Sequence, residues 1–313
     1  MQKILVFGHQ NPDTDAITSA ISYSYYLSQS NQEVEPEPVA LGPVNPETQF
    51  ALDYFNQPAP RVIETAANEV DLVALVDHNE SQQSVSDIKE VSVYSVVDHH
   101  RIANFETADP ILYVALPVGC TQTVIYQMMK FAGVKPTKEI AGLMIAGIVS
   151  DTLLFQSPTT TDQDKKTAEA LAEIAEIDLQ AFGLDLLKAG ANVDDKSALE
   201  IAEGDAKSFP MGDYSIRIGQ INVVDVADVL KRKDEILAVM QSESIDHSYD
   251  AFLLVVTNIL TNDSVGLYVG NENLQASFEA AFNTKIDQQT LDLPGVVSRK
   301  KQVVPPLTKA IED

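Results

Sequence analysis

Short apolar runs that end abruptly in polar residues characterise the first half of the chain. They are rich in branched aliphatic side chains, which is typical of strands buried in a parallel sheet. Such strands are predicted at residues 3–8, 38–41, 61–64, 71–76 and 91–97. Apolar positions recur with helical spacing at residues 15–28, 46–55, 122–131, 137–149 and through 161–188. This alternation predicts an α/β domain with a mostly parallel, Rossmann-like sheet flanked by helices.

The pattern changes after residue 188. Residues 189–196 form a short polar segment, which predicts a linker rather than another helix or strand. Beyond it, strands are predicted at residues 215–223, 252–258 and 265–269, and helices at 226–241 and 274–282. We therefore expect one domain at 1–188, a linker or hinge at 189–196, and a smaller mixed α/β domain at 197–313.

Composition narrows the class of protein. A chain of 313 residues with 45% hydrophobic and 21% charged residues has ordinary globular composition. We expect it to be cytoplasmic and to have no membrane partner, because it shows no signal peptide and no apolar stretch of the roughly 18 residues that a membrane span requires. A net charge of -25 repels polyanions and argues against nucleic acid as a partner.

The histidines gather where predicted strands end. The chain has five, and His9, His78, His99 and His100 all follow such runs, each group with neighbouring aspartates. Singly, each could be a polar loop residue or a histidine paired within the core. Together they indicate a metal site, because open α/β sheets bind ligands at the carboxyl ends of their strands. Aspartate and histidine suit a dinuclear centre with open positions.

Two further residues bear on this site. The only cysteine, Cys120, excludes a thiolate zinc cluster, so the ligands must be nitrogen and oxygen, and Cys120 itself is expected to be a small buried residue. Asp151 follows the apolar residues 140–149, where an unpaired carboxylate would be costly. A hydrogen bond at a helix end would resolve that cost, but the other aspartates and histidines favour a metal.

A cluster of cations near the C-terminus offers a positive site on an acidic chain. Arg299, Lys300 and Lys301 are consecutive, between Ser298 and Gln302. A solvated basic patch is the alternative, but the apolar residues on either side predict an ordered strand or turn. Arginine and lysine suit phosphoryl oxygens. The sequence has neither a P-loop nor a glycine-rich dinucleotide motif.

These motifs together resemble those of the DHH phosphoesterase superfamily. The triplet Asp98-His99-His100 and the upstream loop of Asn11, Pro12, Asp13 and Asp15 mark the superfamily. His9 and the segment 298–302 resemble one branch more closely, the family II inorganic pyrophosphatases, over essentially the full chain. The second domain has no Gly-Gly-His motif, and the first has no room for a regulatory insertion. The resemblance therefore implies the short, unregulated form.

The resemblance implies a set of metal ligands. One ion would be bound by His9, Asp13 and Asp77, and a second by Asp15, Asp77, His99 and Asp151. Asp77 would bridge the two ions. The family's preferred ions are manganese (Mn²⁺) and cobalt (Co²⁺), with additional Mg²⁺ bound with the substrate. From the residues alone, any divalent ion that accepts nitrogen and oxygen ligands would fit, zinc included.

The resemblance also implies a reaction. A hydroxide bridging the two ions would attack pyrophosphate in line and yield two phosphates. Lys207, Arg299 and Lys300 would hold phosphoryl oxygens, and His100 would donate to the substrate. Metals on the first domain and cations on the second imply a site at the domain interface that closes about the linker. A homodimer formed through the N-terminal domain is implied as well.

Some assignments stay open. Asp98 is expected to orient a neighbouring ligand, whereas His78 and Asn79 could contact either a ligand or the substrate. A DHH phosphodiesterase or an exopolyphosphatase would have the same metal ligands with a different substrate preference. A third alternative is a non-catalytic, metal-dependent anion sensor.

Overall fold

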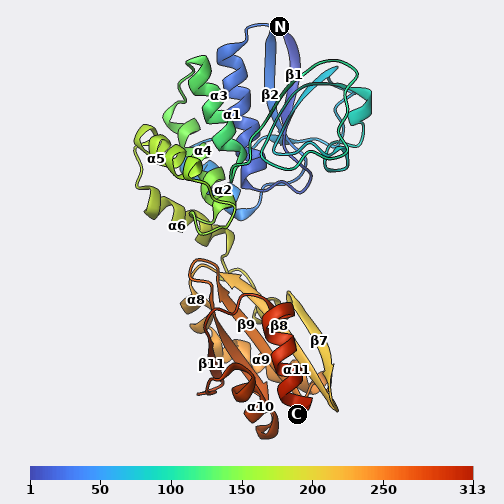
Figure 1. Ribbon diagram of the computed structural model, residues 1–313, viewed down its shortest axis with the longest axis vertical. Coiled ribbons are helices and arrows are strands. Elements are labelled where there is room, and N and C mark those ends of the chain that lie inside the picture. Colours follow the sequence, from blue (N-terminus) through green and yellow to red (C-terminus); the bar gives the residue numbers. More distant parts are fainter. Residues whose placement is uncertain (313) are drawn as a thin grey trace. The chain divides into compact units, whose positions relative to one another are not determined.

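The protein is described here by a computed structural model that covers residues 1–312. The chain forms two compact units, one of Met1–Gly190 and one that begins at Ala191 (Figure 1). Helix α6 (Leu179–Gly190) continues through residues 189 and 190, which were predicted to be linker. Buried Leu186 and Leu187 hold its last turns in place. A bilayer-spanning helix would need a length and an apolar content that no helix within residues 1–312 reaches.

The first unit contains a six-stranded sheet in the order β3-β2-β1-β4-β5-β6, with every neighbouring pair parallel. This confirms the predicted parallel, Rossmann-like sheet. The strand β6 was not predicted, and it is a short edge strand whose residues are exposed or half-buried. The strands are β1 (Gln2–Phe7), β2 (Val34–Ala40), β3 (Arg61–Val62), β4 (Leu72–Val76), β5 (Ser92–Asp98) and β6 (Leu112–Ala115).

Helices cover one face of this sheet, and α1 lies along β1 and β2 (Figure 1). Loops with two short 3₁₀ turns, Ser81–Gln83 and Ile88–Glu90, pack on a second apolar cluster, which contains Leu5, Phe7 and Leu75. The remaining helices of the first unit are α1 (Thr14–Ser30), α2 (Pro46–Tyr54), α3 (Thr121–Ala132), α4 (Lys138–Thr152) and α5 (Asp162–Ala175).

The strand order places three functional loops together. Strands β1 and β4 are neighbours, yet the chain leaves β1 toward β2 on one side and returns to β4 on the other. At such a switch point the loops diverge and leave a crevice at the carboxyl ends of the strands. The loops after β1, β4 and β5 begin at this edge, and they carry His9, Asp77 and His99.

The second unit has a mixed five-stranded sheet, in the order β11-β10-β9-β8-β7, in which only β8 and β9 are parallel. Alternate residues of β9 enter two different cores, as in a strand covered on both faces. Its strands are β7 (Ala206–Met211), β8 (Tyr214–Val223), β9 (Ala251–Asn258), β10 (Asp263–Gly270) and β11 (Thr290–Leu293). Its helices are α7 (Ala198–Glu203), α8 (Val226–Leu230), α9 (Lys233–Asp246), α10 (Glu272–Phe282) and α11 (Val304–Glu312).

One prediction in this unit was wrong in detail, and for the cationic segment one of the two expected conformations is observed. The single helix expected at 226–241 is broken into α8 and α9, because the backbone leaves the helical conformation at Arg232, with φ -105° and ψ 14°. The Arg232 guanidinium donates to the carbonyls of Val193 and Lys196. The cationic segment, which was predicted to be an ordered strand or turn, is one turn of π-helix, Arg299–Val303. The Ser298 side chain accepts the Lys301 N–H and so caps this turn.

Replacing Gly8 with alanine should destabilise the first unit. Gly8 follows β1, and a Cβ there would lie 2.5 Å from the Cβ and 2.7 Å from the Cα of Ala16 on α1. Because a backbone atom cannot move aside cheaply, we expect Gly8→Ala to lower the free energy of unfolding by about 1–3 kcal/mol. Urea titration of the metal-free protein measures this, and an unchanged midpoint would contradict the close packing of α1 on β1.

Candidate metal centre

Asp77 lies at the middle of the candidate site, directly after β4. Its backbone adopts φ 58°, a left-handed conformation that aspartate tolerates better than most residues. Its side chain is buried, and its two oxygens face different histidines. The oxygen Oδ2 lies 3.5 Å from His9 Nε2, and Oδ1 lies 3.3 Å from His99 Nε2. One carboxylate therefore joins two groups of potential ligands.

The first group consists of His9, Asp13 and Asp77, whose ligand atoms all lie within 4.8 Å of one another. Asp13 caps the start of α1, where its Oδ1 accepts the Ala16 N–H at 2.9 Å. Its Oδ2 lies 3.5 Å from His9 Nε2. The other ring nitrogen of His9, Nδ1, is hydrogen-bonded to the Gln10 carbonyl at 2.8 Å. Backbone contacts thus turn both side chains toward Asp77.

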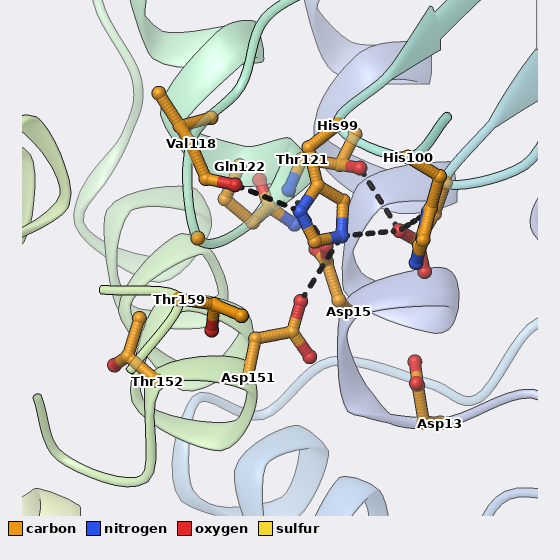
Figure 2. Close-up of polar contacts among 12 residues, drawn as sticks. Asp13, Asp15, His99, His100, Val118, Thr121, Gln122, Asp151, Thr152 and Thr159 are labelled. Carbon is orange, nitrogen blue, oxygen red and sulfur yellow. Dashed lines mark hydrogen bonds and ion pairs between the residues drawn. The ribbon is translucent and has the colours of Figure 1, made fainter. Parts of the chain in front are cut away.

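The second group consists of Asp15, Asp77, His99 and Asp151, again with ligand atoms within 4.8 Å of one another. Figure 2 shows the His99 ring between the Val118 carbonyl and the Asp151 carboxylate. His99 Nδ1 donates to Val118 at 3.0 Å, and its Nε2 lies 3.5 Å from Asp151 Oδ2. A backbone carbonyl on one nitrogen fixes the orientation in which the other nitrogen can bind a metal.

Asp151 lies in the last turn of α4, as its next-to-last residue rather than beyond the helix end as predicted. The chain then passes through three consecutive left-handed residues, Leu153, Leu154 and Phe155, with φ of 47°, 51° and 69°. Such backbone is costly for residues other than glycine, and it persists only where the surrounding packing enforces it. Leu154 is buried, so packing holds this turn in place beside Asp151.

The donor set fits divalent cations. His99 Nε2 is buried and makes no well-directed hydrogen bond within residues 1–312. In that same range, the ion pairs of Asp77 and Asp151 are with histidines alone, and no lysine or arginine offsets their charge. Buried carboxylates without a cation are unfavourable. Carboxylate and imidazole ligands in two groups that share one aspartate therefore suit a pair of divalent ions.

The pKa values reflect the same crowding of charge. Burial, together with the Asp77 charge, raises the pKa of Asp15 to about 7. Burial and the Asp15 charge also raise the pKa of Asp151 well above its ordinary value. Burial opposes protonation of the histidines, but their aspartate neighbours outweigh it and raise the pKa of His9 to about 11 and that of His99 to about 9. Without metal, the cluster therefore retains protons.

The proposed ligands also accept hydrogen bonds from residues that belong to none of the sequence motifs. The Thr121 N–H donates to Asp15 Oδ2 at 2.8 Å, and its hydroxyl donates to Asp77 Oδ1 at 2.9 Å. Ser19 donates to the other oxygen of Asp15 at 2.8 Å. The only sequence signal for Thr121 is its place at the predicted start of a helix. Cys120, just before it, is fully buried as expected.

Asp98 organises the segment that carries His99 and His100. Its Oδ1 accepts both backbone N–H groups, at 2.8 and 3.1 Å, and also lies 2.9 Å from His100 Nδ1. Its Oδ2 accepts the Asn79 amide at 2.7 Å. His78 is buried and stacks on Phe7, and its Nδ1 is hydrogen-bonded to the Val76 carbonyl. The His100 side chain is 52% exposed, which leaves it accessible to a bound ligand.

The predicted cations belong to the second unit. The Arg299 guanidinium donates to the Asp205 carboxylate at 2.8 Å and to the Ile218 carbonyl at 3.3 Å. Lys207 on β7 is the register partner of Ile218, so both cations flank the same part of β8. Lys207 and Lys300 are exposed. The six predicted metal ligands are thus brought together in the first unit, and the predicted cations lie in the second.

Comparison with known proteins agrees with this architecture. Residues 3–148 match the model of the DHH family N-terminal domain, and residues 184–310 match the DHHA2 domain. The sheet and its aspartate and histidine cluster are thus those of a DHH-family protein. A solved structure of Methanococcus jannaschii, described as a "putative family II inorganic pyrophosphatase", matches with a TM-score of 0.60 and 40% identity, over 99% of this chain and 100% of that one.

Relatives with a known name are more similar still. The chain is 58% identical to a protein of Enterococcus faecalis over 99% of both chains, and 55% identical to a protein of Bacillus subtilis over the full length of both. The Bacillus subtilis protein is named manganese-dependent inorganic pyrophosphatase, and the Enterococcus faecalis protein is named probable manganese-dependent inorganic pyrophosphatase. This chain therefore belongs to the family of manganese-dependent inorganic pyrophosphatases.

Metal binding should release protons. Near neutral pH the metal-free cluster is protonated at His9 and His99, whose pKa values are about 11 and about 9, and in part at Asp15. Because ligands bind metal only after losing these protons, the apparent Mn²⁺ affinity should fall as the pH is lowered from about 9 to about 6. Calorimetric titration in two buffers of different ionisation enthalpy counts the protons. Release of none, with an affinity independent of pH, would contradict the assignment.

Proposed function

We propose that this chain is an inorganic pyrophosphatase that hydrolyses pyrophosphate to two phosphates at a dinuclear metal centre. Family membership supports the activity. The single observation that carries the chemistry is the position of Asp77, whose two oxygens face His9 Nε2 and His99 Nε2 at 3.5 and 3.3 Å. A carboxylate that serves two ligand groups holds two ions close enough to act on one substrate.

The proposed ligands follow from the two groups. His9 and Asp13 would bind one ion, Asp15, His99 and Asp151 would bind the other, and Asp77 would bridge them. With three or four protein ligands each, the ions, Mn²⁺ or Co²⁺, keep positions open for water and substrate. When bound, such a pair lowers the pKa of a water molecule and neutralises phosphoryl charge. The backbone contacts of His9, His99 and Asp13 hold the ligands ready for this role.

The substrate would be held by this chain's own cations. Asp98 binds His100 Nδ1, so His100 Nε2 is the atom free to donate to a phosphoryl oxygen. We assign Lys207, Arg299 and Lys300 to the remaining oxygens, with additional Mg²⁺ carried by pyrophosphate. Phosphoryl transfer depends mainly on positioning and on charge stabilisation, which these groups supply. The proposal requires the segment after Gly190 to act as a hinge that lets the two units meet the same substrate.

The assembly is proposed on the family relationship, and the location and partners on the composition and net charge of the chain. We propose a homodimer formed through the N-terminal unit, and a cytoplasmic enzyme with neither nucleic acid nor membrane as a partner. Light scattering coupled to gel filtration tests the dimer, and a mass equal to one chain would contradict it.

Phosphate release tests the function. Chelator-stripped protein should regain pyrophosphate hydrolysis when Mn²⁺ or Co²⁺ is added, more than with Zn²⁺ or Mg²⁺. A dinucleotide and a polyphosphate serve as competing substrates. Cleavage of either one without pyrophosphate hydrolysis would move the chain to the phosphodiesterase or exopolyphosphatase class. No cleavage of any substrate would favour a metal-dependent anion sensor.

Removing a substrate cation should impair turnover and leave the metals bound. We expect Arg299→Ala and Lys300→Ala to lower kcat by roughly a hundredfold or more, as for loss of one group that stabilises transition-state charge. The exposed neighbour Lys301 is the matched control, and Lys301→Ala should retain activity. Metal content is measured in parallel, and loss of bound Mn²⁺ in the Arg299 or Lys300 variants would overturn their assignment to the substrate.

A further inference from the structure

Glu47 lies between the two helix ends that carry three of the six proposed ligands, Asp13, Asp15 and Asp151. Thr14, at the start of α1, stands between Asp13 and Asp15 in the chain. Ser150, in the last turn of α4, precedes Asp151. These two helix ends come from parts of the sequence more than a hundred residues apart. Their separation decides whether the ligands of both ions are correctly placed.

A single carboxylate oxygen connects the two ends. Glu47 Oε1 accepts the Thr14 hydroxyl at 2.6 Å and the Ser150 hydroxyl at 2.5 Å. The Thr14 hydroxyl also lies 3.1 Å from the hydroxyl of Thr48, the residue after Glu47. Thr14 and Thr48 are fully buried. The Thr14 and Ser150 hydroxyls thus share one acceptor oxygen, and hydrogen bonds are stronger away from water.

The start of α2 places the Glu47 carboxylate near Thr14 and Ser150. Glu47 lies in the first turn of α2, which Asn45 caps by accepting the Thr48 N–H and where Pro46 is the first residue. A carboxylate near a helix N-terminus is stabilised by the helix dipole. The other oxygen, Oε2, lies against Gly190, where a Cβ would come within 2.8 Å of it. Glycine at the end of α6 therefore leaves the space that the carboxylate occupies.

We infer that Glu47 is a positioning residue, which holds the start of α1 and the end of α4 at the separation that both ions require. It belongs to neither group of ligand atoms. Its hydroxyl partners adjoin Asp13 of one group and Asp15 and Asp151 of the other, so its loss should weaken both ions together. This inference rests on the proposed dinuclear centre.

The test measures Mn²⁺ binding to chelator-stripped protein, by calorimetry and by the electron paramagnetic resonance spectrum of Mn²⁺. Glu47→Ala should weaken binding by about 10–100-fold, the usual effect of losing a partner of the ligands. Glu47→Gln keeps an acceptor oxygen at the same reach and should bind Mn²⁺ with close to wild-type affinity. Glu35, an exposed glutamate on β2, provides the matched control, and Glu35→Ala should bind like the wild type.

Ser150→Ala is the milder variant, because it removes one hydroxyl and leaves Glu47 in place. It should also weaken Mn²⁺ binding, and adding it to Glu47→Ala should cause little further loss, since both changes break the same contact. The melting temperature of each metal-free variant separates positioning from folding. A Glu47→Ala protein with a lower melting temperature but wild-type Mn²⁺ affinity would overturn the inference. A Glu47→Gln protein that binds Mn²⁺ as weakly as Glu47→Ala would overturn it as well.

The same experiment distinguishes this inference from the proposed function. If wild-type protein binds no Mn²⁺, the dinuclear centre itself is wrong. If the wild type binds Mn²⁺ and hydrolyses pyrophosphate while Glu47→Ala matches it in both, the proposed function stands and the role of Glu47 alone is refuted.

Discussion

The crowding of carboxylates around Asp77 is the constraint on which the rest of the site depends. Asp15 and Asp77 are buried and Asp151 is largely so, with no lysine or arginine ion-paired to any of them within residues 1–312. Like charges this close cannot all remain ionised unless positive charge joins them. Raised pKa values at Asp15, Asp151 and His99 show protons supplying that charge in the metal-free protein. Divalent ions would supply it in the active one.

The fold meets this constraint with rigid elements rather than with long side chains. Parallel strands deliver their ligands to one edge of the sheet, and the switch between β1 and β4 opens a crevice there. Backbone groups then set the direction of each ligand, as the Val118 carbonyl does for His99 and the Thr121 N–H does for Asp15. Ligands held in this way are already oriented for metal binding, so the ions would need little rearrangement of the protein.

The sequence predicted the sheet and the candidate ligands for the same reason. Each loop that carries ligands follows a buried apolar run. Aspartate and histidine directly after such a run can be recognised from neighbouring residues alone. Thr121 and Glu47 could not be found in this way, because their importance lies in contacts with residues distant in the chain. The break between α8 and α9 was also missed, and Arg232 at this break binds the carbonyls of Val193 and Lys196, which are distant in the chain. Local sequence patterns therefore predicted the helices, the strands and the ligands. The residues that hold the ligands in place could be found only from tertiary contacts.

The most direct test of this account is the number of Mn²⁺ ions bound by an Asp77→Asn variant, compared with the wild type and with His9→Ala. Asparagine tolerates the left-handed backbone of position 77 but offers one oxygen instead of two. If Asp77 is shared between the ions, Asp77→Asn should weaken the binding of both, whereas His9→Ala should weaken one. An Asp77→Asn protein that keeps one ion at wild-type affinity would contradict the bridging role and with it the dinuclear centre proposed here.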